Sequence, residues 1–153
     1  MYHAIVEQKV RQGFREMSKG NYQAAVELFA EDVYFSFSGD HAMGGECRTK
    51  AQVSQWFARL YRIFPGIQFE VRSVTVSGWP WNTTATTQFT VRATMRDGQP
   101  YQNQAMQFVR LRWGKIVEDI IFEDTHKLVL ALNRMAEQGV SEAAAAPIGV
   151  LTA

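Results

Sequence analysis

Hydrophobic positions near the start of the chain recur every three or four residues, as they do on one face of an α-helix. Val6, Val10, Phe14 and Met17 follow this spacing, and charged residues occupy most of the intervening positions. The pattern predicts an amphipathic helix. It is expected to end at Gly20, because glycine readily adopts the left-handed conformation that closes a helix.

Two further helices are predicted before residue 66. Asn21 is expected to cap a short one. Thr49 and Gln52 form the capping box of a longer one, which Pro65 and Gly66 end. The expected apolar faces consist of Tyr22, Val26 and Phe29 in the short helix and of Val53, Trp56, Phe57, Leu60, Tyr61 and Phe64 in the longer one.

In other segments the hydrophobic period is two, which is typical of β-strands. Val33 and Phe35 begin such an alternation, and it continues to Phe37. After the helices, four more strands are expected over residues 67–77, 83–95, 101–113 and 116–123, and a last helical stripe is formed by Leu128, Leu132 and Met135. Asp97-Gly98 predicts a tight hairpin turn between the middle strands.

The order of these elements predicts one α+β domain. Helices come first and a four-stranded meander follows, so the helices are expected to cover one face of a curved, mainly antiparallel sheet. A length of 153 residues fits a single domain, which we assign to residues 1–138. The alanine-rich remainder, residues 139–153, is expected to be a disordered, low-complexity tail.

Charge and hydropathy exclude several classes of function. Sixteen Lys and Arg residues balance fifteen Asp and Glu residues, so the net charge is +1. This balance argues against a nucleic-acid partner or an anionic membrane, because phosphate affinity needs clustered basic residues. The beginning of the chain has no apolar signal-peptide core, and no uncharged apolar run is long enough to span a bilayer. We therefore expect a cytoplasmic protein, in which the lone Cys47 forms no internal disulfide.

Four stretches in the right order carry a resemblance to a known family. They are Gly20-Asn21-Tyr22 leading into Leu28-Phe29-Ala30-Glu31-Asp32-Val33; the helix that ends at Phe64-Pro65-Gly66; Asp97-Gly98 followed by Tyr101 and Asn103; and Gly114-Lys115-Ile116-Val117-Glu118 leading to Phe122-Glu123-Asp124-Thr125. Over about residues 5 to 135, the chain resembles the nuclear transport factor 2-like superfamily and its SnoaL-like polyketide cyclase branch. The resemblance implies a cone-shaped α+β barrel around a pocket, and a homodimer formed through the outer face of the sheet.

The resemblance also implies a first catalytic candidate, Asp124, at the end of the last strand. SnoaL-like cyclases place an acid/base aspartate there, and an apolar pocket would raise the pKa of such a carboxyl group. The structural alternative is that Asp124 is the N-cap of the last helix, where the helix dipole favours the ionised form.

A base needs polar partners, and the third strand of the meander offers two. Asn103 and Gln107 share a face with the apolar Val109 and Leu111, while arginines alternate with them, so this face is expected to point inward. Neutral amides there would orient or polarise a carbonyl oxygen of the substrate. The alternatives are a pair of hydrogen-bonded structural amides, or a different strand register that exposes them.

The loop at residues 39–46 provides a second catalytic candidate, His41, which by resemblance lies at the pocket mouth. It would relay protons there, and the alternative is a solvated loop histidine. No spacing of His, Cys, Asp or Glu matches a zinc site, so neither a metal nor another cofactor is expected.

Aromatic residues are expected to shape the pocket for a flat, apolar ligand. We predict that Phe37, Trp56 and Tyr61 contribute to it, and Phe37 stands about where ketosteroid isomerases carry their base. Limonene epoxide hydrolases have charged residues in the last strand where this chain has isoleucines, so neither chemistry is expected. Glu118 and Asp119 lie close to a turn and are expected to be exposed.

The sequence thus predicts a SnoaL-like domain with an apolar pocket for a small cyclic or polyketide-like molecule. If the domain is catalytic, it would perform acid/base isomerisation or cyclisation without a cofactor. The alternative is a non-catalytic module of the same fold that binds a ligand or forms dimers.

Overall fold

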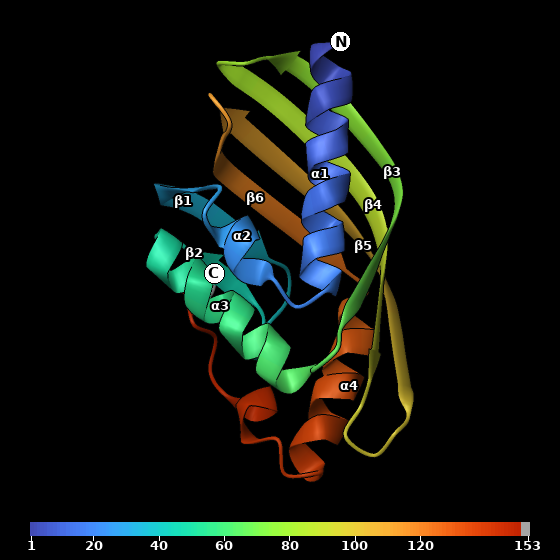
Figure 1. Ribbon diagram of the computed structural model, residues 1–153. Coiled ribbons are helices and arrows are strands. Elements are labelled where there is room, and N and C mark those ends of the chain that lie inside the picture. Colours follow the sequence, from blue (N-terminus) through green and yellow to red (C-terminus); the bar gives the residue numbers. More distant parts are fainter. Residues whose placement is uncertain (151–153) are drawn as a thin grey trace.

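Four α-helices, a short 3₁₀ helix and six strands follow one another along residues 1–150, the part of the chain that the computed structural model describes (Figure 1). The helices are α1 (Tyr2–Ser18), α2 (Tyr22–Val26), α3 (Lys50–Ile63), α4 (Thr125–Glu137) and η1 (Ser141–Ala144). The strands are β1 (Phe29–Phe37), β2 (Gly45–Cys47), β3 (Gln68–Trp79), β4 (Asn82–Thr94), β5 (Pro100–Arg112) and β6 (Lys115–Glu123).

All six strands form one curved sheet in the order β2-β1-β6-β5-β4-β3. Every neighbouring pair is antiparallel except β1 and β6, which run parallel. Helices α1, α2 and α3 lie in front of the concave face (Figure 1). The predicted α+β fold, with helices on a mainly antiparallel curved sheet, is therefore confirmed. The sheet does not close into a barrel, because β2 and β3, at the two ends of the strand order, do not pair with each other.

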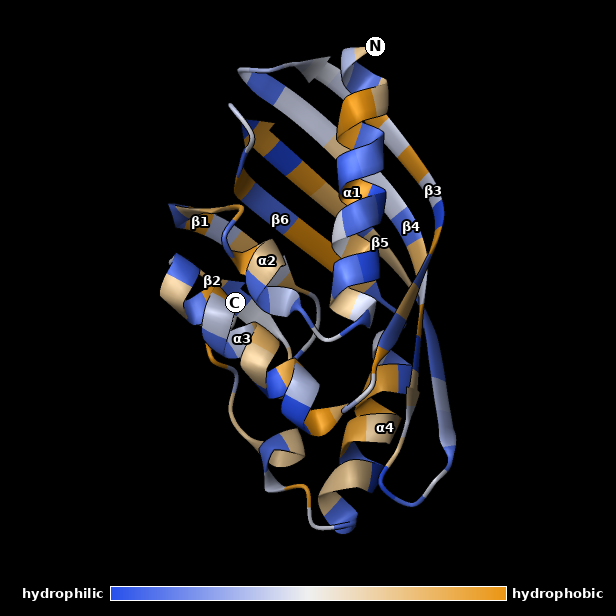
Figure 2. Ribbon diagram, viewed as in Figure 1, coloured by the Kyte–Doolittle hydropathy of each residue, from blue (hydrophilic) through white to orange (hydrophobic). Residues whose placement is uncertain are grey.

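The pattern of hydrophobic residues explains how the helices attach to the sheet. Figure 2 shows short hydrophobic and hydrophilic stretches following one another along β6 and bands of both kinds around α1. Phe14 of α1 packs against Phe89 of β4, with ring centroids 4.8 Å apart. Trp56 of α3 packs against Phe35 of β1 at 4.9 Å. Each helix thus buries its apolar stripe against the inward-facing positions of the strands.

Two local features differ from the sequence-based expectations. Phe29 begins β1 instead of completing α2, since it pairs with Ile116 on the parallel strand β6. The loop at residues 39–46 also contains strand β2, in which Gly45 pairs with Phe37. Both pairings join segments that are distant or glycine-rich, so no local hydrophobic period announces them.

Residues 139–150, the larger part of the predicted tail, fold back along the molecule. Val150 forms a short antiparallel bridge with Glu46 of β2, with N–O distances of 2.8 and 2.9 Å. Ala143 of η1 is buried. The rest of the predicted tail, residues 151–153, lies outside the described part of the chain.

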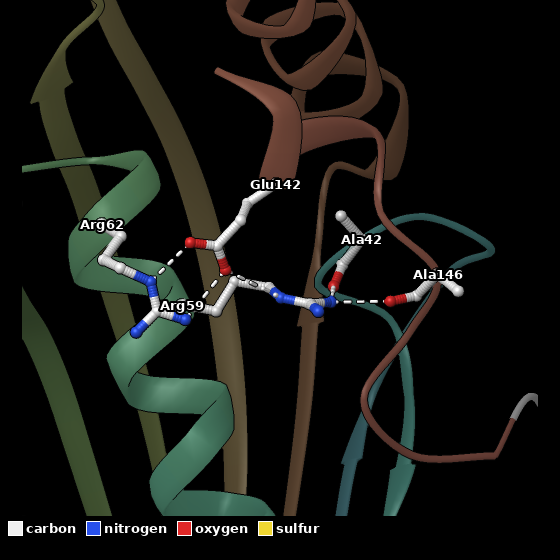
Figure 3. A network of polar contacts seen from close by, with 5 residues as sticks. All are labelled: Ala42, Arg59, Arg62, Glu142 and Ala146. Carbon is white, nitrogen blue, oxygen red and sulfur yellow. Dashed lines mark hydrogen bonds and ion pairs between the residues drawn. The ribbon is translucent and has the colours of Figure 1, made fainter.

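Side chains of α3 hold this C-terminal segment in place (Figure 3). Arg62 and Glu142 form a paired hydrogen bond, with Nη2 and Oε2 2.8 Å apart. Arg59 donates from Nη1 to the carbonyl oxygens of Ala42 and Ala146, at 2.9 and 2.7 Å. Arg59 therefore ties the C-terminal segment to the loop that follows β1.

Within residues 1–150, no helix combines the length and the apolar character needed to cross a bilayer.

Candidate functional site

A cavity of about 390 Å³ lies between the helices and the concave face of the sheet. One end is lined by Ile5 and Trp113, which are 48% and 73% exposed and lie near the start of α1 and in the β5–β6 turn. The other end is lined by Phe64, Ile67 and Leu128, all of which are buried. The cavity therefore has an open mouth and a closed end. In Figure 1 the start of α1 lies beside the mark N, and α4 lies at the opposite end of the molecule.

The wall of this cavity is mostly apolar and carries few charged side chains. The charged residues that line it are Lys9, Asp119 and Glu123. Apolar walls with a few polar groups are typical of sites for small organic molecules, since the polar groups set the orientation of the ligand.

Asp119 projects from the middle of β6 into this apolar environment and is only 1% exposed. Its two carboxylate oxygens each lie 3.1 Å from the Nε2 atom of Gln107, on the neighbouring strand β5. Burial raises the pKa of Asp119 to about 7, and the hydrogen bond from Gln107 only partly opposes this. A carboxyl group with such a pKa exists in both protonation states near neutral pH, as a general acid or base requires.

The expectation that Asp119 is exposed is therefore wrong. Nearness to a turn in sequence does not decide exposure, because side chains alternate between the two faces of a strand. Asp119 shares its face with the buried Ile121, and the helices cover that face. Glu118 points to the other face, where it pairs with Arg110 at 3.0 Å.

Glu123 is the second carboxyl group in the wall and lies towards the closed end. Its Oε1 atom accepts hydrogen bonds from the Tyr101 hydroxyl and from Asn103 Nδ2, both at 2.9 Å. Burial raises its pKa to about 7; these two hydrogen bonds oppose the shift, and the nearby charge of Asp124 adds to it. The carboxyl group is thus held in one orientation and is also able to exchange a proton near neutral pH.

Asn103 and Gln107 lie on the face of β5 that points inward, as predicted, but only one of them reaches the cavity. Gln107 lines the cavity beside Asp119. Asn103 is only 1% exposed, but it is not among the lining residues. Its Nδ2 atom also contacts the Asp124 carbonyl oxygen at 2.9 Å, and its Oδ1 accepts from the backbone N–H of Gln104 at 2.8 Å. Asn103 therefore orients Glu123 from behind the wall.

Asp124 is the N-cap of α4, which was the structural alternative to a catalytic role. It is exposed, and its Oδ1 accepts a hydrogen bond from the backbone N–H of Lys127 at 3.2 Å, which makes it the N-cap of α4. It does not line the cavity. A catalytic role for Asp124 stays a prediction, without a contact in the cavity to support it.

His41 also lies outside the cavity wall, and both of its ring nitrogens have partners. Nε2 donates to the Ser38 carbonyl oxygen at 2.9 Å, and Nδ1 accepts from the backbone N–H of Met43 at 3.2 Å. Burial lowers the pKa of His41. This histidine orders the loop as a neutral ring, and its predicted role as a proton relay has no cavity contact to support it.

The structure separates the three aromatic candidates. Phe37 and Trp56 form part of the cavity wall, and the indole of Trp56 donates to the Met43 carbonyl oxygen at 2.8 Å. Tyr61 lies outside the wall, since its hydroxyl donates to the carbonyl oxygen of Met17 in α1. This hydrogen bond links α3 to α1, and burial raises the pKa of Tyr61 to about 12, so the hydroxyl keeps its proton at neutral pH.

Sequence reasoning missed the two carboxyl groups that do line the cavity. The sequence did contain a signal for them. Asp119, Ile121 and Glu123 are spaced two residues apart, so both carboxyl groups share one face of β6 with an apolar residue. In residues 1–150, no group of three or more His, Cys, Asp or Glu side chains is placed to hold a metal ion. Two carboxyl groups in the cavity wall, each with a pKa raised by burial to about 7, are able to exchange protons near neutral pH.

Solved structures with the same fold share little sequence with this chain. PrhC from Penicillium brasilianum has a TM-score of 0.78 at 13% identity, covering 94% of this chain and 95% of PrhC. A protein from a Jannaschia species, assigned to the SnoaL-like polyketide cyclases, has a TM-score of 0.67 at 18% identity, covering 82% of this chain and 89% of that protein. A Bacillus subtilis protein assigned as an isomerase has a TM-score of 0.69 at 16% identity, with coverages of 82% and 91%. These similarities establish the fold.

The family itself is established by sequence. A search among curated proteins found no match to this chain. The sequence profile of the SnoaL-like domain, however, matches residues 10–119, which run from the middle of α1 to the first part of β6. The chain therefore belongs to the SnoaL-like domain family.

Proposed function

We propose that the cavity binds a small, apolar cyclic or polyketide-like molecule and that Asp119 exchanges a proton with it. The observation that carries this proposal is a buried carboxyl group in an apolar cavity, with one neutral amide as its hydrogen-bonding partner. Burial without a cationic partner raises the pKa of a carboxyl group, and this makes its ionised form a stronger base.

The reaction class follows from what a carboxyl group does without further equipment. Ionised Asp119 takes a proton from a carbon next to a carbonyl group, and neutral Asp119 returns the proton to another atom of the resulting enolate. Isomerisation follows these steps directly. In ring closure the enolate carbon attacks a second carbonyl group of the ligand, and neutral Asp119 gives its proton to the alkoxide oxygen that forms. Gln107 would act as a positioning residue, because its amide holds the Asp119 carboxyl at 3.1 Å.

The ketone 2-tetralone, whose C1 hydrogens are acidic, provides a direct test of proton exchange. We expect the protein to accelerate the exchange of the C1 hydrogens of 2-tetralone for deuterium in D₂O. Proton NMR of the ketone measures the rate of this exchange. Chemical-shift changes of the cavity residues would report binding separately from exchange. Binding without accelerated exchange would favour the alternative function, a ligand-binding module without catalysis.

We also propose that the protein forms a homodimer through the convex face of its sheet. Met106 and Phe122 are neighbours in the β5–β6 register on that face, and they are 44% and 60% exposed. Burying such adjacent apolar side chains favours association. Sedimentation velocity at micromolar concentration is expected to show a dimer, and Phe122→Lys is expected to dissociate it. A monomeric wild-type protein would contradict this proposal.

A further inference from the structure

The two carboxyl groups of the cavity lie on the same face of one strand. Asp119 and Glu123 are four positions apart in β6, which corresponds to about 13 Å between their Cα atoms at the usual rise of a strand. The side chain between them on this face is that of the apolar Ile121, which also lines the cavity. The wall therefore presents two hydrogen-bonding points with apolar surface between them.

At Glu123, hydrogen bonding distinguishes the two carboxyl oxygens. Oε1 accepts from both Tyr101 and Asn103, whereas Oε2 takes part in neither of these bonds. A proton carried by this group would reside on Oε2, because Oε1 already accepts from two donors. Oε2 is thus the atom that remains for a ligand, and its orientation is fixed by the bonds to Oε1.

The two residues that donate hydrogen bonds to Glu123 are themselves held in place. Asn103 is itself anchored to the Asp124 carbonyl oxygen and to the Gln104 N–H, so it is held on both sides. The Tyr101 ring stacks on Phe64 with centroids 5.2 Å apart. Rigid support of this kind is what a hydrogen bond to a ligand needs, because the orientation of the group is set before binding.

The open end of the cavity differs in character from this closed end. Asp119 lies in the middle of β6, with Gln107 as its partner, and the exposed residues at the mouth lie beyond it. A cavity volume of about 390 Å³ lies within the range of pockets that hold molecules of two or more rings. A ligand of that size would extend from Asp119 to Glu123.

We propose that the cavity recognises an apolar, ring-containing molecule with oxygen groups at both ends, one bonded to Asp119 and the other to Glu123. The oxygens are hydroxyl or carbonyl groups, because neutral Glu123 donates from Oε2 and Asp119 accepts or donates according to its protonation state. This inference deepens the proposed function and rests on its ligand-binding part, but it does not require catalysis.

Two related probes test the inference by isothermal titration calorimetry at pH 6. The first is 4,4′-dihydroxybiphenyl, which has a hydroxyl group at each end of a rigid two-ring body, and the second is 4-hydroxybiphenyl, which has only one. We expect the wild-type protein to bind the dihydroxy compound about tenfold more tightly or better, as a second buried hydrogen bond provides. Asp124→Asn serves as the control and is expected to show the same preference.

Two substitutions of Glu123 separate its role in recognition from its role in folding. Glu123→Gln keeps an acceptor for Tyr101 and Asn103 and places an N–H₂ donor near the Oε2 position, so the preference for the dihydroxy probe is expected to persist. Glu123→Met removes both functions, and its preference is expected to fall to about twofold or less. Thermal melting of each variant shows that the protein used for titration is folded.

The outcomes also distinguish this inference from the proposed function. Equal binding of the two probes by the wild-type protein would overturn the two-ended ligand and leave an apolar ligand site intact. If Glu123→Met keeps the full preference in a folded protein, the assignment of Glu123 is overturned. Failure of both probes to bind up to their solubility limits would contradict this inference and the proposed ligand-binding function together.

Discussion

The inward face of β6 and the start of α4 each carry an aspartate, and the two aspartates lie in opposite environments. Asp119 is 1% exposed and has one neutral amide as a partner, and its pKa is raised to about 7 by burial. Asp124, five residues later, is exposed and caps the backbone N–H of Lys127. The comparison shows that a carboxyl group acquires acid/base character from its surroundings and not from its position near the end of a strand.

Strand geometry explains how such different environments lie so close together. Glu123 and Asp124 are adjacent in sequence, yet Glu123 lines the cavity while Asp124 faces solvent. Successive side chains of a strand point to opposite faces, and β6 ends between these two residues. A shift of one position along the chain therefore changes a cavity group into a helix cap.

The largest expected effect concerns proton exchange. Asp119→Asn is expected to slow the exchange of 2-tetralone hydrogens roughly 10²- to 10⁴-fold at pH 7, since general-base catalysis contributes about that much. Asp124→Asn is expected to change the rate by about twofold at most, because asparagine also caps a helix. Equal losses in the two variants, measured by proton NMR, would abolish the distinction between the two aspartates.

The pH dependence of stability is expected to reveal the buried state of Asp119. Between its ordinary pKa of 3.8 and about 7, the native protein keeps a proton that the unfolded chain has released. The free energy of unfolding therefore decreases as the pH rises through this range, by as much as about 4 kcal/mol, and stays reduced above it.

Urea denaturation of wild type and Asp119→Asn from pH 4 to pH 8 measures this term. The variant is expected to lose the part of the slope that belongs to Asp119 and to keep the part that belongs to Glu123, whose pKa is also raised to about 7 by burial. An unchanged slope in the variant would show that Asp119 is not buried in the way described.

Removal of the hydrogen bond from Gln107 is expected to have a smaller effect, which is a shift in the midpoint of the pH–rate profile. Gln107 lowers the pKa of Asp119 against the effect of burial. Gln107→Leu removes this bond, so the midpoint of the pH–rate profile for tetralone exchange should move upward by roughly one pH unit. A downward movement would mean that Gln107 stabilises the neutral form of Asp119.

The smallest effect is expected at the helix cap. Asp124→Ala removes the acceptor for the Lys127 N–H and should reduce the free energy of unfolding by about 1 kcal/mol, while Asp124→Asn restores most of it. Tetralone exchange is expected to remain at the wild-type level in folded Asp124→Ala. A large loss of exchange in the folded Asp124→Ala variant would support a catalytic role for Asp124.

Much of the fold is predictable from the sequence because its elements obey local periods. The hydrophobic spacing of α1 and α3 and the alternation along β3 to β6 indicate these elements to within a few residues. Strand β2 and the folding back of residues 139–150 follow instead from pairing between distant segments. The bridge between Glu46 and Val150 is an example, since neither residue has a local signal for it.

The candidate site is less predictable, because its chemistry depends on what covers each face of the sheet. Sequence reasoning identifies the inward face of Gln107 and the wall positions of Phe37 and Trp56. It does not identify Asp119, because the closeness of a turn suggests exposure. Only the sheet and the helices in front of it show that this carboxyl group is shielded from solvent and that, within residues 1–150, its side-chain partner is the neutral amide of Gln107.

The ionisation of Asp119 itself is the most direct test of this account. Carbon-13 NMR of the side-chain carboxyl groups, with Asp119→Asn used to assign the resonance, gives the pKa in the folded protein without any ligand. The account predicts that Asp119 titrates near pH 7. Titration near the ordinary value of 3.8 would contradict it, because the group would then be fully ionised at neutral pH and would be too weak a base for the proposed proton exchange.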